Sequence, residues 1–194
     1  MESRFAPADA AYWKPVSTGG LVALLACSGW LFMLLLTDKD GFIQVLDSSN
    51  LAIHEFGHPL FGVFGEYIGF WGGTLMELIV PLVIVVAFVR ERAALSVAVA
   101  GVWFFENFLY IAHYMADARA QELPLVGGGE HDWAYILGHA GLLQSDTAIA
   151  HVVSTIGWVG MIASLVFAAA VWLVQRQEQP AAVSPPDSAT SRTR

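Results

Sequence analysis

The chain has 194 residues, of which 56% are hydrophobic and only 13% are charged. Its mean hydropathy of +0.59 is well above that of a soluble globular domain, which excludes a soluble enzyme. The formal net charge of -8 argues against a nucleic-acid partner, because nucleic-acid binding depends on an excess of Lys and Arg. Cys27 is the only cysteine, which excludes an intramolecular disulfide and a thiolate metal cluster.

The first apolar segment covers residues 19–36 and is long enough to cross a hydrocarbon core of about 30 Å as a helix. Residues 24–27 resemble a lipoprotein processing site, but the apolar run continues well past Cys27. We therefore expect an uncleaved membrane anchor. Residues 1–18 are expected to form a separate N-terminal segment before it.

Three further segments are apolar and long enough to be transmembrane helices, and they cover residues 70–89, 93–116 and 147–174. We therefore expect residues 19–175 to form one polytopic, all-α membrane domain. The stretch that follows is rich in Pro, Ser, Ala and Thr, so residues 176–194 are predicted to be a disordered tail.

Residues 51–69 are also apolar, but they include two histidines, two glutamates, a proline and four glycines. Such a segment is a poor lipid-facing span. The positive-inside rule places Arg90, Arg92 and Arg176 in the cytoplasm, and a cytoplasmic N-terminus then requires an even number of spans. We predict four transmembrane helices plus a re-entrant or half-buried helix over residues 51–69; the alternative is five spans.

The positions of the six histidines favour the four-span topology. With four spans all six lie towards the outer face, whereas with five spans His54 and His58 lie about a bilayer thickness from the other four. Ionisable groups inside a membrane cost about 2.5 to 3.5 kcal/mol each on insertion scales, so they are expected to have partners. We expect a multi-pass protein of a bacterial inner (cytoplasmic) membrane, with a site towards the outer face.

Residues 54–58 read His-Glu-Phe-Gly-His, which is an HExxH motif. On a helix, His54 and His58 share a face, so both imidazoles can bind one Zn²⁺ ion. Glu55 is predicted to be the catalytic base that takes a proton from a zinc-bound water. The alternative is a histidine pair that only forms hydrogen bonds inside a polar bundle, which would not require Glu55.

A catalytic zinc site needs a third protein ligand, and the best source is the segment over residues 127–139. It begins with three glycines, which allow the backbone to approach a site closely, and His131, Asp132 and His139 follow. In a helix that begins near His131, Asp132 and His139 share a face. Spacing does not choose between these three residues, and the segment could instead be a loop in which Asp132 caps the next helix.

Polar side chains follow one face of the predicted helix over residues 93–116, at Glu106, Tyr110, His113 and Asp117. We expect this face to point inward. Glu106 and His113, like His139, are candidates for an alternative ligand or for a hydrogen-bond partner of a zinc-bound imidazole. The alternative is that Glu106 and Asn107 only hold helices together. Glu77 has a weaker claim and is expected to be a satisfied residue of the bundle.

The HEFGH motif at residues 54–58, followed by Pro59 in a Gly-rich membrane segment, resembles the site-2-protease family of intramembrane metalloproteases. In that family, HExGH supplies two zinc ligands and the general base. The sequence over residues 123–128, with Asp132 beyond it, faintly resembles the family's second motif, whose Asp is the third ligand. The resemblance implies that Asp132 completes the zinc site, although Asp132 lies between His131 and Trp133 and not in a Leu-Asp-Gly sequence.

These observations predict a zinc-dependent membrane hydrolase, most simply a metalloprotease that cleaves a peptide bond in or near the lipid bilayer. A membrane lipid amidase or hydrolase with the same zinc chemistry is the close alternative. The substrate is then another membrane protein or a lipid. A different class of function is a histidine-rich protein that holds haem, iron or copper, with His113 and His151 as axial ligands on facing helices.

Overall fold

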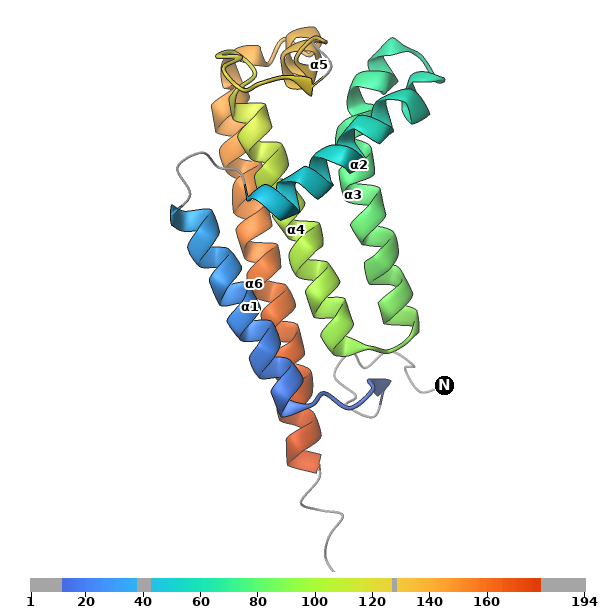
Figure 1. Cartoon of the computed structure of the whole chain (residues 1–194), viewed down its shortest axis with the longest axis vertical. Helices are drawn as coiled ribbons and strands as arrows, with labels where there is room; N and C mark the ends of the chain where they lie inside the picture. The colour runs from blue at the N-terminus through green and yellow to red at the C-terminus, as the bar shows by residue number, and fades with distance from the viewer. Residues whose placement is uncertain (1–11, 38–42, 127–128, 179–194) are drawn as a thin grey trace, which may run out of the picture.

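The computed structural model describes residues 12–37, 43–126 and 129–178, and all regular secondary structure in these residues is helical (Figure 1). The prediction of an all-α fold is confirmed. The elements in chain order are α1 (Thr18–Thr37), α2 (Gln44–Gly62), α3 (Glu66–Arg90), α4 (Ala94–Ala116), α5 (Asp132–His139), the short 3-10 helix η3 (Leu143–Ser145) and α6 (Asp146–Glu178).

Within the described residues, four helices are long and apolar enough to cross a membrane: α1, α3, α4 and the continuous segment of η3 and α6. In Figure 1 they run along the long axis of the molecule. Their bounds lie close to those of the four predicted spans, except at α6. This helix continues to Glu178, so residues 176–178 of the predicted tail are helical, and the remainder of that tail lies outside the described residues.

Helix α2 is the exception to this parallel arrangement. It begins beside α4 near the middle of the bundle and runs obliquely towards the end where α3 starts (Figure 1). It is not one of the four candidate spans, and it buries Asp47, Asn50, His54 and Gly57 on one face. The described part of the chain therefore offers four candidate spans and one shorter oblique helix, as in the four-span prediction.

The predicted half-buried segment over residues 51–69 is in fact divided between two helices. Helix α2 ends at Gly62, and Gly65 precedes α3 with a φ of 115°, which glycine adopts without strain. Residues 66–69 therefore form the first turn of α3 and not the end of the HExxH helix. The sequence did not indicate this boundary, because the apolar residues continue through the turn.

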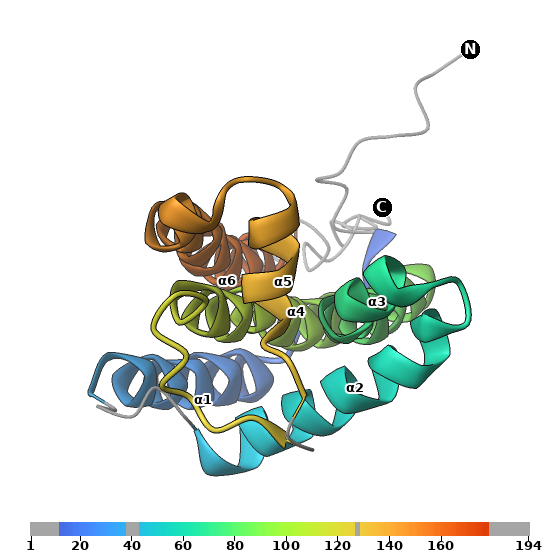
Figure 2. The same cartoon turned by 90° about the horizontal axis from the view of Figure 1, so that it is seen from above.

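Helices α2 and α3 cross so closely that their backbones touch at Gly57 and Gly72. A β-carbon at either glycine would overlap the backbone of the other, so a larger residue at either position would force the helices apart. Seen from above in Figure 2, α3 and α4 lie between α6 on one side and α2 on the other. The close crossing brings the HExxH motif of α2 into contact with α3.

Helix α5 covers the end of the bundle at which α3 and α6 begin (Figure 1). A core of buried apolar side chains holds it there, made by Ile111, Ala112 and Met115 of α4, Trp133, Ile136 and Leu137 of α5, and Ala150 of α6. Because α5 is only eight residues long, this packing and not its own helix propensity fixes its position.

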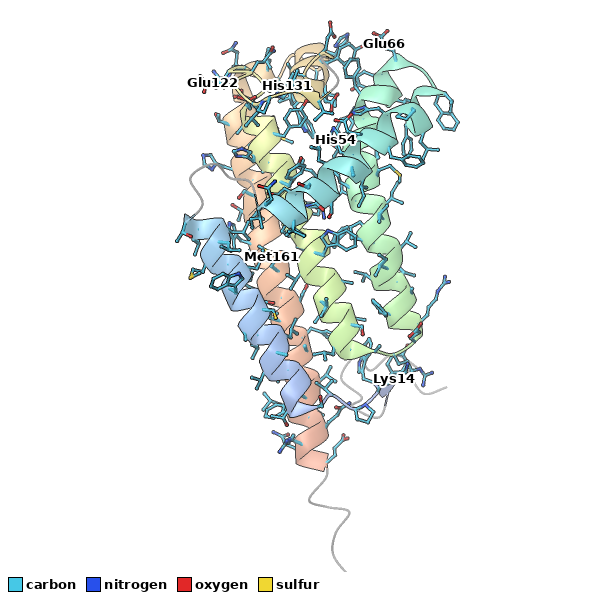
Figure 3. All side chains as sticks on the ribbon, in the orientation of Figure 1. Lys14, His54, Glu66, Glu122, His131 and Met161 are labelled. Carbon is cyan, nitrogen blue, oxygen red and sulfur yellow. The ribbon has the colours of Figure 1, made fainter. Side chains whose placement is uncertain are left out.

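The two ends of the bundle differ in charge. At one end Lys14 donates its backbone N–H to Arg92 O at 2.8 Å, and the side chain of Arg176 contacts Thr18. Figure 3 places Lys14 at this end, and Glu66, Glu122 and His131 at the opposite end. With Arg90 at the end of α3, four basic residues gather at the end away from α5, where Glu91 lies 3.8 Å from Lys14.

Candidate metal centre

Two histidines and one aspartate, far apart in the sequence, meet where α2 and α5 approach each other. Ligand atoms of His54, His58 and Asp132, one from each residue, all lie within 4.8 Å of one another. His54 Nε2 lies 2.9 Å and His58 Nε2 lies 3.3 Å from the same carboxylate oxygen, Asp132 Oδ2. The two imidazole rings stand edge to face, with their centroids 4.8 Å apart. Three potential metal ligands therefore converge on one point.

The second nitrogen of each imidazole faces an acceptor on α3. His54 Nδ1 lies 3.2 Å from Glu77 Oε1, and His58 Nδ1 lies 2.9 Å from the backbone oxygen of Gly69. An imidazole that donates its proton from Nδ1 keeps the lone pair of Nε2 available for a metal. The surroundings of both rings thus favour the tautomer in which the Nε2 atoms act as ligands.

The cluster is largely removed from solvent. The exposed fractions of His54, Asp132 and Glu77 are 5%, 5% and 1%, while His58 is partly exposed. Buried carboxylates are stable only when cations or hydrogen-bond donors compensate them. Two imidazoles and a carboxylate form a donor set that suits Zn²⁺, and three protein ligands leave a coordination position for water or substrate.

Protons and a cation compete for the same atoms in this cluster. Burial lowers the pKa of His54, but hydrogen bonds with Asp132 and Glu77 outweigh burial and raise it well above its usual value. The hydrogen bond with Asp132 likewise raises the pKa of His58 against the effect of burial. Burial would raise the pKa of Asp132, but hydrogen bonds with His54 and His58 hold it below its usual range. A metal ion bound here would therefore displace protons.

The N-terminus of α5 holds Asp132 in place. His131 is the N-cap residue, and its Nδ1 accepts a hydrogen bond from the backbone N–H of Ala134 at 3.3 Å. The backbone N–H of Asp132 donates to the hydroxyl of Tyr114 at 3.2 Å, and the Tyr114 ring stacks on His131 at 4.1 Å between centroids. Burial lowers the pKa of His131, which favours the neutral form that this cap requires.

Of the three residues that spacing left open, the structure brings only Asp132 to the histidine pair. His131 is buried as the N-cap, and its Nε2 lies 3.4 Å from Asp117 Oδ2. His139 is exposed at the end of α5, where its Nδ1 bonds to Tyr135 O at 2.8 Å. Of the three glycines that begin the segment, Gly129 is described and the other two lie outside the described residues.

The two candidates on α4 also lie apart from the three-residue cluster. Glu106 is buried, and its Oε2 accepts a hydrogen bond from Asn50 Nδ2 at 3.0 Å, which ties α4 to α2. His113 is exposed. The glutamate that contacts a cluster histidine is Glu77, which we expected to be a satisfied residue of the bundle. The available signal was a glutamate inside an apolar helix, and Glu77 and Glu106 share it equally.

A cavity of about 570 Å³ adjoins the cluster beside α2. Its lining residues are Leu51, His54, Glu55, Tyr110, His113, Tyr114, Leu123, Pro124, Leu125 and Val126. The backbone N–H groups of Glu122 and Leu123 donate to the carboxylate of Asp117 at 2.9 and 3.1 Å, which fixes the segment that forms one wall. Glu55 thus faces the same cavity as the ligand candidate His54.

A second cavity, of about 310 Å³, lies next to the first one along α4. Asp47, Glu106 and His151 line it, and it shares Tyr110 and His113 with the first cavity. The two histidines that could hold a haem therefore line the same cavity.

Comparisons with protein-family models, with curated proteins and with solved structures give no match to this chain. The resemblance to site-2 proteases therefore stays a prediction that rests on the HEFGH motif, and the case for function rests on the geometry of this centre.

Proposed function

We propose that this protein is a membrane-embedded metallohydrolase in which His54, His58 and Asp132 bind one Zn²⁺ ion and Glu55 is the general base. The observation that carries the proposal is the convergence of two Nε2 atoms on Asp132 Oδ2, at 2.9 and 3.3 Å. A histidine pair that served only to bind helices together would not need a third ligand, supplied by a residue 78 positions away from His54.

Each residue of the centre has a distinct part in the proposed reaction. A bound zinc ion lowers the pKa of a coordinated water towards 7. Glu55 faces the cavity next to His54, so its carboxylate can accept the proton that this water loses on attack. Tyr110 and Tyr114 line the same cavity, and their hydroxyl groups are donors for the negative charge that develops on a substrate carbonyl.

The lining of the cavity favours a peptide substrate over an anionic lipid. Among its described lining residues there is no Lys or Arg to pair with a phosphate, whereas Glu55 adds a negative charge. Leucine, valine, proline and tyrosine side chains form most of the wall. We therefore propose that the substrate is a peptide bond in or next to an apolar segment of another membrane protein. A lipid amidase is the competing reading that the experiment must exclude.

For the bacterial cytoplasmic membrane that we propose as its location, the distribution of charge supports one orientation. Lys14, Arg92 and Arg176 gather at the end of the bundle away from α5. By the positive-inside rule that end faces the cytoplasm, and the centre then lies towards the outer face. The lipid bilayer would surround the apolar side chains on the outside of the four long helices.

The test combines metal analysis with a Glu55→Gln variant of the full-length protein purified in detergent. We expect about one zinc ion per chain in both proteins, because Glu55 is not one of the three ligands. Bacterial membranes that contain the wild type should release peptide fragments that membranes containing Glu55→Gln do not. A wild-type preparation that binds no metal contradicts the proposal, and altered lipids with unchanged peptides would replace the peptidase with a lipid hydrolase.

A further inference from the structure

Three residues of α3 face the HExxH motif at intervals of one helical turn. Gly69, Gly73 and Glu77 are four residues apart, so they lie along one face of the helix. Gly69 O accepts from His58 Nδ1 at 2.9 Å, and Glu77 Oε1 lies 3.2 Å from His54 Nδ1. Between them, Gly73 leaves the space that the His54 ring occupies, because a β-carbon there would overlap the ring. One face of α3 therefore contacts both histidines of the motif.

Glu77 is costly to bury where it lies. Only 1% of its surface is exposed, and it belongs to a helix that is long and apolar enough to cross a membrane. An ionised carboxylate in such surroundings needs a nearby positive charge or strong donors. In the described part of the chain, His54 is the residue within ion-pair distance of it. The carboxylate thus faces Nδ1 of His54, on the side of the ring away from the proposed metal-binding atom Nε2.

We propose that Glu77 is the positioning residue of His54 and the second carboxylate that balances the charge of a divalent ion in this centre. The inference rests on the proposed metal site. At ion-pair distance from Nδ1, the Glu77 carboxylate holds the ring with Nε2 towards Asp132 and makes the imidazole a stronger donor to the metal. With Asp132 it supplies two negative charges, which match a dication bound by neutral histidines in a region of low dielectric constant.

Three variants separate the effects of charge, hydrogen bonding and packing. Glu77→Gln keeps the size of the side chain and an oxygen that can accept from Nδ1, but it removes the charge. Glu77→Asp keeps the charge and shortens its reach, and Glu77→Leu removes both charge and acceptor. Glu106→Gln is the matched control, because Glu106 is also 1% exposed in an apolar helix but is hydrogen-bonded to Asn50 away from the cluster.

The measurement is the affinity of each full-length, detergent-purified protein for Zn²⁺, by competition with a chelator, together with the absorption spectrum of the Co²⁺-loaded form. We expect Glu77→Gln to bind zinc about 10- to 100-fold more weakly than the wild type, with a shifted Co²⁺ spectrum. Glu77→Leu should bind more weakly still, and Glu77→Asp should recover part of the loss. Glu106→Gln should match the wild type in both measurements.

The possible outcomes distinguish this inference from the proposed function. If the wild type binds zinc and Glu77→Gln binds it equally, with an unchanged Co²⁺ spectrum, Glu77 has no positioning role while the metal site stands. If Glu106→Gln loses as much affinity as Glu77→Gln, the effect is general to buried glutamates and the inference fails. A wild type that binds no zinc overturns the metal site itself. Where Glu77→Leu does not fold, the comparison of the Gln and Asp variants decides.

Discussion

The imidazole of His54 lies against Gly73, so closely that a β-carbon at residue 73 would overlap three atoms of the ring. The ring cannot move far in response, because Asp132 and Glu77 contact it on either side at 2.9 and 3.2 Å. The absence of a side chain at this one position of α3 is therefore a condition for the observed orientation of a proposed metal ligand.

The first prediction follows from this contact. Gly73→Ala should reduce the zinc affinity of the purified protein by about 10-fold or more, because the added methyl group displaces His54 from Asp132. Gly138→Ala is the control, since a β-carbon at this helical position would meet no atom within 4 Å. Chelator competition measures both variants. Equal zinc affinity in Gly73→Ala and the wild type would show that His54 is not held as described.

The second prediction concerns the identity of the third ligand. Asp132→Asn should lower zinc affinity by more than about 100-fold, since a direct ligand contributes more than the groups behind it. Glu130→Gln, an exposed acidic neighbour, should not change it, and neither should His139→Ala. Zinc content after dialysis against a weak chelator distinguishes the variants. Loss of zinc in His139→Ala with retention in Asp132→Asn would reverse the assignment.

The third prediction is the pH dependence of zinc binding. The pKa values of His54 and His58 are raised, so both rings bind protons more tightly than free histidine does, and zinc needs the unprotonated nitrogens. Zinc affinity should therefore fall steeply as the pH drops and should keep rising with pH above the usual histidine pKa of about 6.5. Titrations at several pH values, together with the number of protons released on binding, check this. An affinity that does not change with pH would contradict the histidine ligands.

The fourth prediction tests the orientation in the membrane. In a Cys27→Ser background, a cysteine in place of Glu122 should react with a membrane-impermeant maleimide in intact cells or spheroplasts. A cysteine in place of Glu91, which lies beside Lys14 at 3.8 Å, should react only after the membrane is opened. The opposite labelling pattern would invert the topology, and labelling of neither site in opened membranes would show that both are covered.

The four long helices were predictable because each is an apolar run ended by charged or turn residues, and hydrophobicity over about 20 residues is a strong signal. The boundary between α2 and α3 was not predictable from the sequence. Gly62, Gly65 and Gly69 all lie in one apolar stretch, and only the fold shows which of them ends the helix. Glycine spacing alone does not tell a turn from a close helix contact.

The candidate site was predictable only where its residues are close together in the sequence. His54 and His58 are one turn apart, so their shared face follows from the helix itself. Asp132 and His139 also share a face, but seven residues of helix separate them by about 10 Å along the axis, so the two cannot serve one ion equally. Which end of α5 meets α2 depends on the packing of Trp133 and its neighbours, and that information is not local.

Glu77 and Glu106 illustrate the same limit. Each is a glutamate within an apolar helix, and we predicted Glu106 to be the better candidate for the site. The oblique course of α2 decides between them, because it carries Asn50 past Glu106 and His54 past Glu77. A crossing angle between two helices is set by contacts along both, such as that of Gly57 with Gly72, and it cannot be read from either helix alone.

The position of Asp132 at the first turn of α5 gives a bound ion a mechanical role as well. Two of the proposed ligands belong to α2, and the third belongs to α5, 78 residues after His54. A bound ion would therefore link α5, which covers one end of the bundle, to α2 in its interior. Closing so long a loop restricts the unfolded chain and stabilises the folded one. Zinc removal should therefore loosen α5 before any of the four long helices, and faster amide hydrogen exchange at Trp133 and Ile136 would report it.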